Sequence, residues 1–171
     1  LAYLKSLHKK AKENNCKIGV KLVRGAYMEK ERERANDLGY KDPIQPTKEA
    51  TDNDYDLALE YCVENVDDIS ICAGTHNEDS SQYLANLMQQ YGVEKTDKRI
   101  YFAQLLGMSD HISFNLSSEK YNVAKYVPYG PVKEVLPYLI RRAEENTSVA
   151  GQTSRELLLI QKEIRRRRSS K

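Results

Sequence analysis

The sequence predicts an α/β fold built on a parallel β-sheet. Apolar segments of strand length occur at residues 18–23, 69–74, 99–105 and 121–127. Longer segments with a helical pattern or helix-favouring composition separate them. Polar or aromatic residues follow the end of each apolar segment. Strands that alternate with helices are typical of βα units, in which neighbouring strands run parallel.

Four such units are half the number found in a closed (β/α)8 barrel, which typically has about 250 residues. Since the sequence has 171 residues, we predict that it supplies roughly half of a TIM-type barrel. An open doubly wound sheet has the same alternation of elements. That fold normally carries a Gly-x-Gly-x-x-Gly turn, and the sequence contains none.

The predicted helices differ in how clearly their ends are marked. Asp79 is expected to be an N-cap, Gly92 to follow the end of the same helix, and Pro131 to occupy a first helical turn. Two prolines in residues 41–47 predict a loop. We expect helices at residues 1–15, 28–38, 48–66, 79–91, 131–146 and 151–168, and a short helix or a turn at residues 109–116.

Composition excludes few classes of function. The chain is 40% apolar and 30% charged with a net charge of +2, which suits one globular domain and indicates no strongly charged partner. Its three cysteines lack metal-ligand spacing, so we expect no metal site and a reducing compartment. No signal peptide or membrane-spanning run is visible. Because Leu1 already lies within a helical pattern, we expect a fragment of a longer protein.

Chemically useful residues collect where the predicted strands end. Barrel enzymes place their active sites at the carboxyl ends of their strands. Charged, histidine and tyrosine side chains there predict a pocket for an anionic ligand. Lys21 and Arg24 belong to a strand that should be buried, so each needs an anionic partner, either a phosphate or an acid elsewhere in the fold. The strand-end residues are Lys21, Arg24, Tyr27, Thr75, His76, Asn77, Leu105 and Tyr126.

Two adjacent arginines occur in the helix predicted at residues 131–146. Arg141 and Arg142 could grip a carboxylate through bidentate hydrogen bonds if the helix end faces a cavity. Glu145 lies one turn after Arg141 and could hold that side chain in place. An ordinary ion pair on a solvated helix face explains the same residues.

Five ordered motifs resemble the proline dehydrogenase family, flavoenzymes that begin proline breakdown. The motifs occupy residues 19–27, 75–77, 104–108, 125–131 and 138–146, so the resemblance covers nearly the whole chain. It implies that residues 1–171 form the C-terminal part of one catalytic (β/α)8 barrel domain, with a C-terminal helix added. The N-terminal remainder, including a lysine and an aspartate near the substrate, would then precede this sequence.

The resemblance also implies an activity and its residues. The reaction is oxidation of L-proline to 1-pyrroline-5-carboxylate, the first step of proline catabolism, with hydride transfer to N5 of FAD. Arg141 and Arg142 would hold the substrate carboxylate, Tyr126 would pack on its ring, and Tyr27 and Leu105 would line the same site. Glu145 would fix an arginine or the tyrosine hydroxyl. The implied FAD contacts are Lys21, Val23, Arg24, Gly25, Ala26, Thr47, Lys48, Thr75, His76, Asn77 and Leu105.

Other functions also fit parts of the sequence. Some relatives carry arginine first and lysine second where this chain has Lys21 and Arg24, which leaves the detailed hydrogen bonding open. Hydroxyproline dehydrogenase is a close alternative. A flavin-free barrel lyase that binds a phosphorylated acid would need a glycine-rich last loop, and residues 127–130 contain only one glycine. A fragment binding membrane or nucleic acid through Arg165–Arg168 lacks a broad basic face, so we expect no nucleic-acid partner.

The family resemblance implies partners beyond the substrate. Electrons would pass to membrane quinone, and the basic C-terminal helix could contact an anionic membrane surface. The protein would then be cytoplasmic and peripheral to the inner membrane in a bacterium, or on the matrix side of the mitochondrial inner membrane in a eukaryote.

Overall fold

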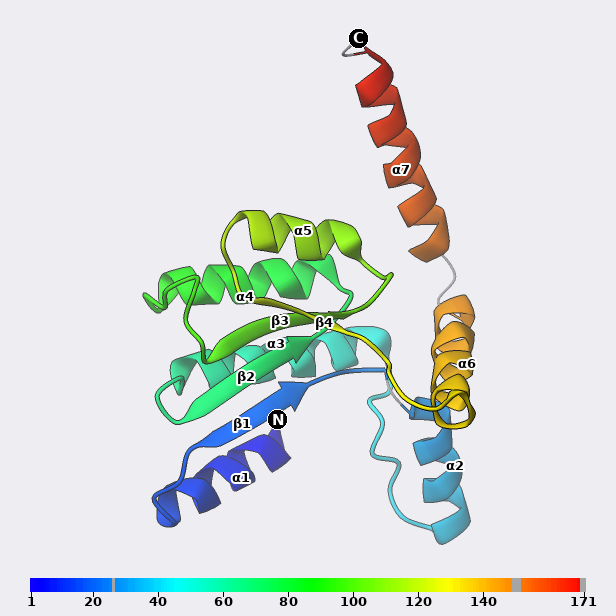
Figure 1. Cartoon of the computed structure of the whole chain (residues 1–171). Helices are drawn as coiled ribbons and strands as arrows, with labels where there is room; N and C mark the ends of the chain where they lie inside the picture. The colour runs from blue at the N-terminus through cyan, green and yellow to red at the C-terminus, as the bar shows by residue number, and fades with distance from the viewer. Residues whose placement is uncertain (26, 149–151, 170–171) are drawn as a thin grey trace. The chain divides into compact units, whose positions relative to one another are not determined.

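The computed structural model describes the backbone of residues 1–25, 27–148 and 152–169 (Figure 1). The chain divides into two compact units, Leu1–Tyr126 and Val127–Lys171, which are described separately. The first unit holds the sheet, and the second holds two helices.

The first unit is built on a four-stranded parallel sheet. Its strands are β1 (Ile18–Leu22), β2 (Ile69–Gly74), β3 (Ile100–Leu105) and β4 (Val123–Tyr126), and they lie side by side in chain order. Each crossover between neighbouring strands contains at least one helix. The predicted fold class, a parallel sheet made by βα units, is therefore confirmed. The predicted fourth strand was too long at both ends, because only Val123–Tyr126 pair with β3.

Five helices belong to this unit. They are α1 (Ala2–Glu13), α2 (Met28–Leu38), α3 (Lys48–Glu64), α4 (Glu78–Gln90) and α5 (Asp110–Ser118). Figure 1 shows α3, α4 and α5 on one side of the sheet. The core lies between these helices and the strands, and its fully buried side chains include Leu59, Ile69, Leu84, Ile100 and Phe102. Burial of this apolar surface is the main force that holds the layers together.

The starts of α3 and α4 follow from their capping residues. Thr47 accepts a hydrogen bond from the amide of Ala50, and Asn77 accepts one from the amide of Ser80. The prediction that Asp79 caps α4 is wrong. Asp79 lies in the first turn instead, where a carboxylate also interacts favourably with the positive end of the helix. Gly92 has a φ of 66° after the end of α4, as its expected role requires.

Alternation along the strands gives the sheet two different faces. Val20, Leu22, Ile71 and Phe102 point toward the helices, and these side chains are buried or half-buried. The other face is called the open face here. It carries Lys21, Cys72, Gly74, Tyr101, Ala103, Leu105, Ala124 and Tyr126. Lys21, Tyr101 and Tyr126 on this face are exposed.

The second unit contains the two predicted C-terminal helices. These are α6 (Val132–Ser148) and α7 (Gln152–Ser169). Pro131 precedes α6, and its carbonyl accepts hydrogen bonds from the amides of Glu134 and Val135. Pro137 lies inside α6, where it removes one backbone donor from the helix. No helix in the described ranges combines the length and apolar character that crossing a membrane requires.

Candidate active site

Predicted site residues from all four strands lie at the carboxyl end of the sheet. Lys21, Leu105 and Tyr126 share the open face, and the ammonium nitrogen of Lys21 lies 5.0 Å from the centre of the Tyr126 ring. Gly74 has no side chain and so leaves room above β2 for Lys21 and Val23. A Cβ at Gly74 would come within 2.9 Å of a methyl of Val23 and 3.5 Å of Cε of Lys21. The open face is therefore shaped so that Val23 and Lys21 can lie close over β2.

The two basic residues at the end of β1, Lys21 within the strand and Arg24 just after it, point to opposite sides of the sheet. Lys21 is exposed on the open face, so the expectation that it lies in a buried strand is wrong. Arg24 is three residues further on and turns toward α3, and only 14% of its side chain is exposed. The cause is the two-residue period of a strand, which separates residues i and i+3 to different faces. The pair therefore cannot act as one cluster of two neighbouring cations.

Arg24 connects three elements through its guanidinium group. One terminal nitrogen (Nη1) lies 2.9 Å from a carboxylate oxygen of Asp52 in α3. The other (Nη2) donates to the hydroxyls of Thr75, at 3.2 Å, and Ser80, at 3.1 Å. The guanidinium also stacks 4.5 Å from the centre of the Tyr55 ring. Arg24 thus ties the end of β1 to α3, to the loop after β2 and to the first turn of α4.

Asp52 joins Arg24 to a second predicted cofactor residue. Its other carboxylate oxygen lies 2.6 Å from the ammonium of Lys48, one helical turn earlier. Lys48 and Thr47 are both exposed at the start of α3. The carboxylate consequently holds two cations at the carboxyl end of the sheet. The i, i+4 spacing of Lys48 and Asp52 is a signal of this pair that sequence alone contains.

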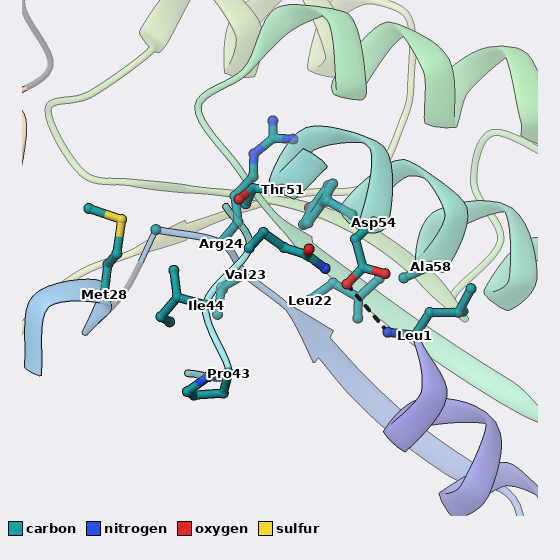
Figure 2. A pocket seen from close by; sticks show the side chains of 13 residues that line it. Leu1, Leu22, Val23, Arg24, Met28, Pro43, Ile44, Thr51, Asp54 and Ala58 are labelled. Carbon is teal, nitrogen blue, oxygen red and sulfur yellow. Dashed lines mark hydrogen bonds and ion pairs between the residues drawn. The ribbon is translucent and has the colours of Figure 1, made fainter. Parts of the chain in front are cut away.

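A pocket of about 290 Å³ lies beside Arg24, between the end of β1, the loop at residues 43–45 and α3 (Figure 2). Val23, Arg24 and Gly25 line it on one side, and Asp54 and Tyr55 line it on another. The Tyr55 hydroxyl is buried, with no hydrogen-bond partner among the described residues. Burial raises the pKa of this phenol well above its usual value, so it stays protonated at neutral pH.

Thr75 is prepared to act as a hydrogen-bond donor. Its side-chain oxygen accepts from the amide of Asn77, at 3.1 Å, and from Arg24, at 3.2 Å. Two accepted bonds use both lone pairs of a hydroxyl, so its hydrogen is directed toward a further acceptor. Thr75 is only 7% exposed, which makes a bound group a suitable acceptor.

His76 is linked to a residue that sequence patterns do not single out. Its Nδ1 lies 2.9 Å from the hydroxyl oxygen of Ser109, which precedes α5. A buried polar chain runs beside this pair. The amide of Gln104 donates to the carbonyl of Thr75, and the hydroxyl of Ser113 donates to Gln104. These contacts join residues that are far apart in sequence, so only the fold reveals them.

The remaining predicted site residues have fewer described contacts. Tyr27 is exposed with a φ of 60°, and Gly25 has a φ of 75° in the same turn. In the second unit, Arg141 is exposed, and the guanidinium of half-buried Arg142 lies 5.3 Å from the centre of the Tyr138 ring. Ala26 and the side chain of Glu145 lie outside the described residues. Across the described part of the chain, no three potential metal ligands gather.

Solved structures with a similar fold include proline utilization A proteins. The protein from Bdellovibrio bacteriovorus, described as inactivated by N-propargylglycine, superposes with a TM-score of 0.79 at 28% identity. The match covers 87% of this chain and 15% of that one. A Bradyrhizobium japonicum proline utilization A variant has a TM-score of 0.74 at 23% identity over 88% of this chain and 15% of its own. The alternation of strands and helices around a parallel sheet is therefore typical of a TIM-barrel-type fold. This chain forms part of such a fold.

Sequence relatives agree with this fold. Mitochondrial proline dehydrogenase 1 of Drosophila melanogaster is 47% identical over 92% of this chain and 24% of its own length. The human protein of the same name is 49% identical, over 88% and 26%. Hydroxyproline dehydrogenase of Xenopus laevis is 44% identical, over 88% and 33%. This chain spans about a quarter of the length of the first two. Because the sequence model of the proline dehydrogenase family matches residues 1–155, the chain belongs to that family.

Proposed function

We propose that the protein containing this chain oxidises L-proline to 1-pyrroline-5-carboxylate with FAD as its cofactor. The observation that carries the proposal is family membership together with the gathering of Lys21, Leu105 and Tyr126 on one face at the carboxyl ends of the strands. Chemistry in barrel enzymes takes place at this end of the sheet.

The donors at this end suit an anionic group that accepts hydrogen bonds. Lys21 has no carboxylate partner among the described residues, since its ammonium faces the Tyr126 ring instead. Thr75 has a hydroxyl hydrogen to donate, and the ammonium of Lys48 stands at the exposed start of α3. Phosphates and flavin carbonyls are acceptors of this kind. Arg24, also a predicted FAD contact, is held by Asp52, Thr75 and Ser80, and its buried Nη1 makes no hydrogen bond among the described residues, which leaves that nitrogen able to donate to a bound acceptor.

The substrate requires a grip on its carboxylate and an apolar surface for its ring. In this proposal Arg141 and Arg142 bind the carboxylate, Glu145 orients an arginine, and Tyr126, Tyr27 and Leu105 contact the ring. No protein side chain accepts a hydride, and FAD supplies that acceptor when it is bound. The chain's own residues hold C5 of proline in position and exclude water, which favours the neutral amine that hydride loss requires.

Further parts of the proposal concern the whole protein. The N-terminal remainder of the barrel would complete the open face, which is where barrel strands direct their inner side chains. Membrane quinone would accept the electrons, with the protein peripheral to the membrane. Eukaryotic relatives carry mitochondrial names, which supports a mitochondrial location for a eukaryotic protein. The matrix side of the inner mitochondrial membrane, or the cytoplasmic side of the inner membrane in a bacterium, is the finer part of the proposal.

Hydroxyproline is a second candidate substrate. Hydroxyproline dehydrogenases from Xenopus laevis and Bos taurus are 44% and 42% identical to this chain, close to the values for the proline enzymes. The two substrates differ by one hydroxyl on the ring, so the same carboxylate grip and ring contacts serve both.

A visible absorption spectrum of the full protein, taken before and after each amino acid is added, tests the proposal. Bound flavin that bleaches with proline supports proline oxidation. Bleaching with hydroxyproline alone moves the assignment to the second candidate. Purified full-length protein that binds no flavin when FAD is supplied contradicts both.

A further inference from the structure

The β3–α5 loop, residues 106–109, connects the end of β3 to the start of α5 at the carboxyl end of the sheet. Two of its residues have a left-handed backbone, Gly107 with a φ of 78° and Ser109 with a φ of 49°. Glycine adopts this conformation freely, whereas it is unfavourable for serine because serine has a Cβ. A loop with such a residue keeps its shape where neighbouring groups determine that shape.

The start of α5 lacks a constraint that the two preceding helices have. Thr47 and Asn77 each accept a hydrogen bond from a helix amide through their side chains, and these bonds fix the starts of α3 and α4. Ser109 occupies the same position before α5 and makes no such side-chain bond to the helix. Contacts from another element are therefore needed to hold this loop in place.

Lys125 of β4 supplies contacts to the loop and to both of its neighbours in the chain. Its ammonium donates to the carbonyl of Met108 and to the carboxylate of Asp110, the first residue of α5, at 2.8 Å each. It also lies 3.5 Å from the carbonyl oxygen of Leu105, the last residue of β3. An ammonium has three N–H donors, so these three acceptors use all of them. Because only 23% of the Lys125 side chain is exposed, these charge-assisted bonds are stronger than bonds made at an open surface.

The loop in turn is bonded to two residues of the proposed substrate site. Leu105 and Tyr126 are register partners on β3 and β4, and both lie on the open face. The amide of Leu106 donates to the carbonyl of Tyr126 at 3.0 Å, and the amide of Met108 donates to the carbonyl of Leu105 at 3.1 Å. A shift of the loop would therefore disturb the backbone of both residues.

We propose that Lys125 is a positioning residue for the substrate, which acts through the β3–α5 loop and keeps Leu105 in place beside Tyr126. The inference rests on the proposed function, in which these two side chains contact the substrate ring. Lys125 itself points to the helix side of the sheet, since side chains alternate along a strand and its neighbour Tyr126 lies on the open face. Ring contacts are made before and during hydride transfer, so a displaced Leu105 should raise KM more than it lowers kcat.

Three substitutions test this role. Lys125→Met removes the ammonium and keeps an unbranched side chain. Lys125→Arg restores a positive charge with several N–H donors, so it should behave like wild type. Lys95→Met is the matched control, because Lys95 also binds a carboxylate at 2.8 Å, that of Glu119, directly after the end of α5 that lies away from the loop.

Hydrogen exchange of the full protein, followed by mass spectrometry, measures the loop without any ligand. Amides in residues 106–109 should exchange about tenfold faster in Lys125→Met, because the bonds that hold the loop closed are lost. They should exchange at the wild-type rate in Lys95→Met and Lys125→Arg. If Lys125→Met does not fold, Asp110→Asn weakens the same contact at an exposed position, and its loop should exchange about threefold faster.

Steady-state oxidation of the amino acid that bleaches the flavin measures the consequence for the substrate. In Lys125→Met, KM should rise about five- to tenfold, while kcat stays within about twofold of wild type. Both constants should be unchanged in Lys95→Met and restored in Lys125→Arg. A purely structural role would instead lower kcat through loss of folded enzyme and leave KM unchanged.

Each measurement can overturn the proposal. Equal exchange of the loop in wild type and in Lys125→Met, or equally faster exchange in Lys95→Met, contradicts the role of Lys125 in holding the loop. Faster exchange with an unchanged KM contradicts the role in positioning the substrate. If wild type oxidises neither proline nor hydroxyproline, the proposed function fails, while the exchange comparison still decides whether Lys125 holds the loop.

Discussion

The ammonium of Lys21 lies 5.0 Å from the centre of the Tyr126 ring, although these residues belong to β1 and β4, the two outer strands of the sheet. The lysine side chain runs over Gly74 on β2, where any Cβ would meet its Cε at 3.5 Å. A cation and an aromatic face thus meet above the inner strands. This arrangement gives the carboxyl end of the open face one positive charge beside an apolar ring.

We expect Lys21→Met to weaken FAD binding about tenfold, because a cation that binds an anionic acceptor contributes about 1.5 kcal/mol or more. Stability should change little, since Lys21 is exposed and a cation–π contact at such a site contributes about 0.5–1 kcal/mol. Calorimetric titration of FAD into flavin-free protein measures the first effect.

Lys17→Met provides the control for Lys21. Lys17 is also an exposed lysine, but it precedes β1 at the opposite end of the strand. Equal loss of affinity in both variants would show that overall charge, rather than the position of Lys21, attracts the cofactor.

Much of the fold could be predicted because its pattern is local. Apolar runs of strand length mark β1, β2 and β3 to within about one residue, and the helix between β2 and β3 ends before Gly92 as expected. The start of that helix was misplaced because Asn77 and Asp79 both suit a helix start, and only the bond from the Ser80 amide identifies Asn77 as the cap.

The site was less predictable because its contacts join distant segments. Ser109 follows His76 by 33 residues, and its hydroxyl contacts the imidazole from a left-handed backbone that no sequence pattern indicates. The opposite directions of Lys21 and Arg24 could have been inferred from the strand period. That inference requires knowing that one face of β1 is covered by helices and the other is open.

Gly74→Ala should destabilise the protein by about 1–3 kcal/mol and displace Val23 and Lys21. The new Cβ would lie 2.9 Å from a methyl of Val23 and 3.1 Å from the carbonyl oxygen of Leu22, and backbone cannot move aside as a side chain can. Urea unfolding measures the loss of stability. A FAD titration tests whether the displaced side chains matter for binding.

Gly19→Ala is the matched substitution for Gly74. Gly19 also lies in a strand and on the open face, but a Cβ there would have nothing within 4 Å. The glycine-to-alanine change itself should be neutral or slightly stabilising at this position. Similar losses in the two variants would mean that close approach at Gly74 is not the cause.

Asp52→Asn should reduce the free energy of unfolding by about 2 kcal/mol, because it removes the counter-charge that Asp52 provides to the largely buried Arg24. Arg24 would then hold Thr75 and Ser80 less firmly, so we also expect weaker FAD binding. Lys48→Met removes the exposed member of the same group, and its effect on stability should stay below about 0.5 kcal/mol. A larger loss from Lys48→Met than from Asp52→Asn would show that Arg24 does not depend on Asp52.

Asp97 predicts a specific dependence of stability on pH. Hydrogen bonds from the side chain and the backbone amide of Arg99 lower the pKa of Asp97 below its usual value. In the unfolded chain that pKa is about 3.9. The folded state therefore binds the proton less readily, so the stabilisation is complete above about pH 4 and is lost as pH falls through the folded pKa.

The measurement is the melting temperature of wild type and Asp97→Asn from about pH 6 to about pH 2. Asp97→Asn should be less stable at the upper end, and the difference should shrink as the pH falls below about 4. Asp67→Asn is the control, because Asp67 also pairs with Arg99, at 2.7 Å, but its side chain is 91% exposed. Such a pair adds little stability, so this variant should follow the wild-type curve. A constant difference between wild type and Asp97→Asn at every pH would show that the loss arises from packing rather than from the charge of Asp97.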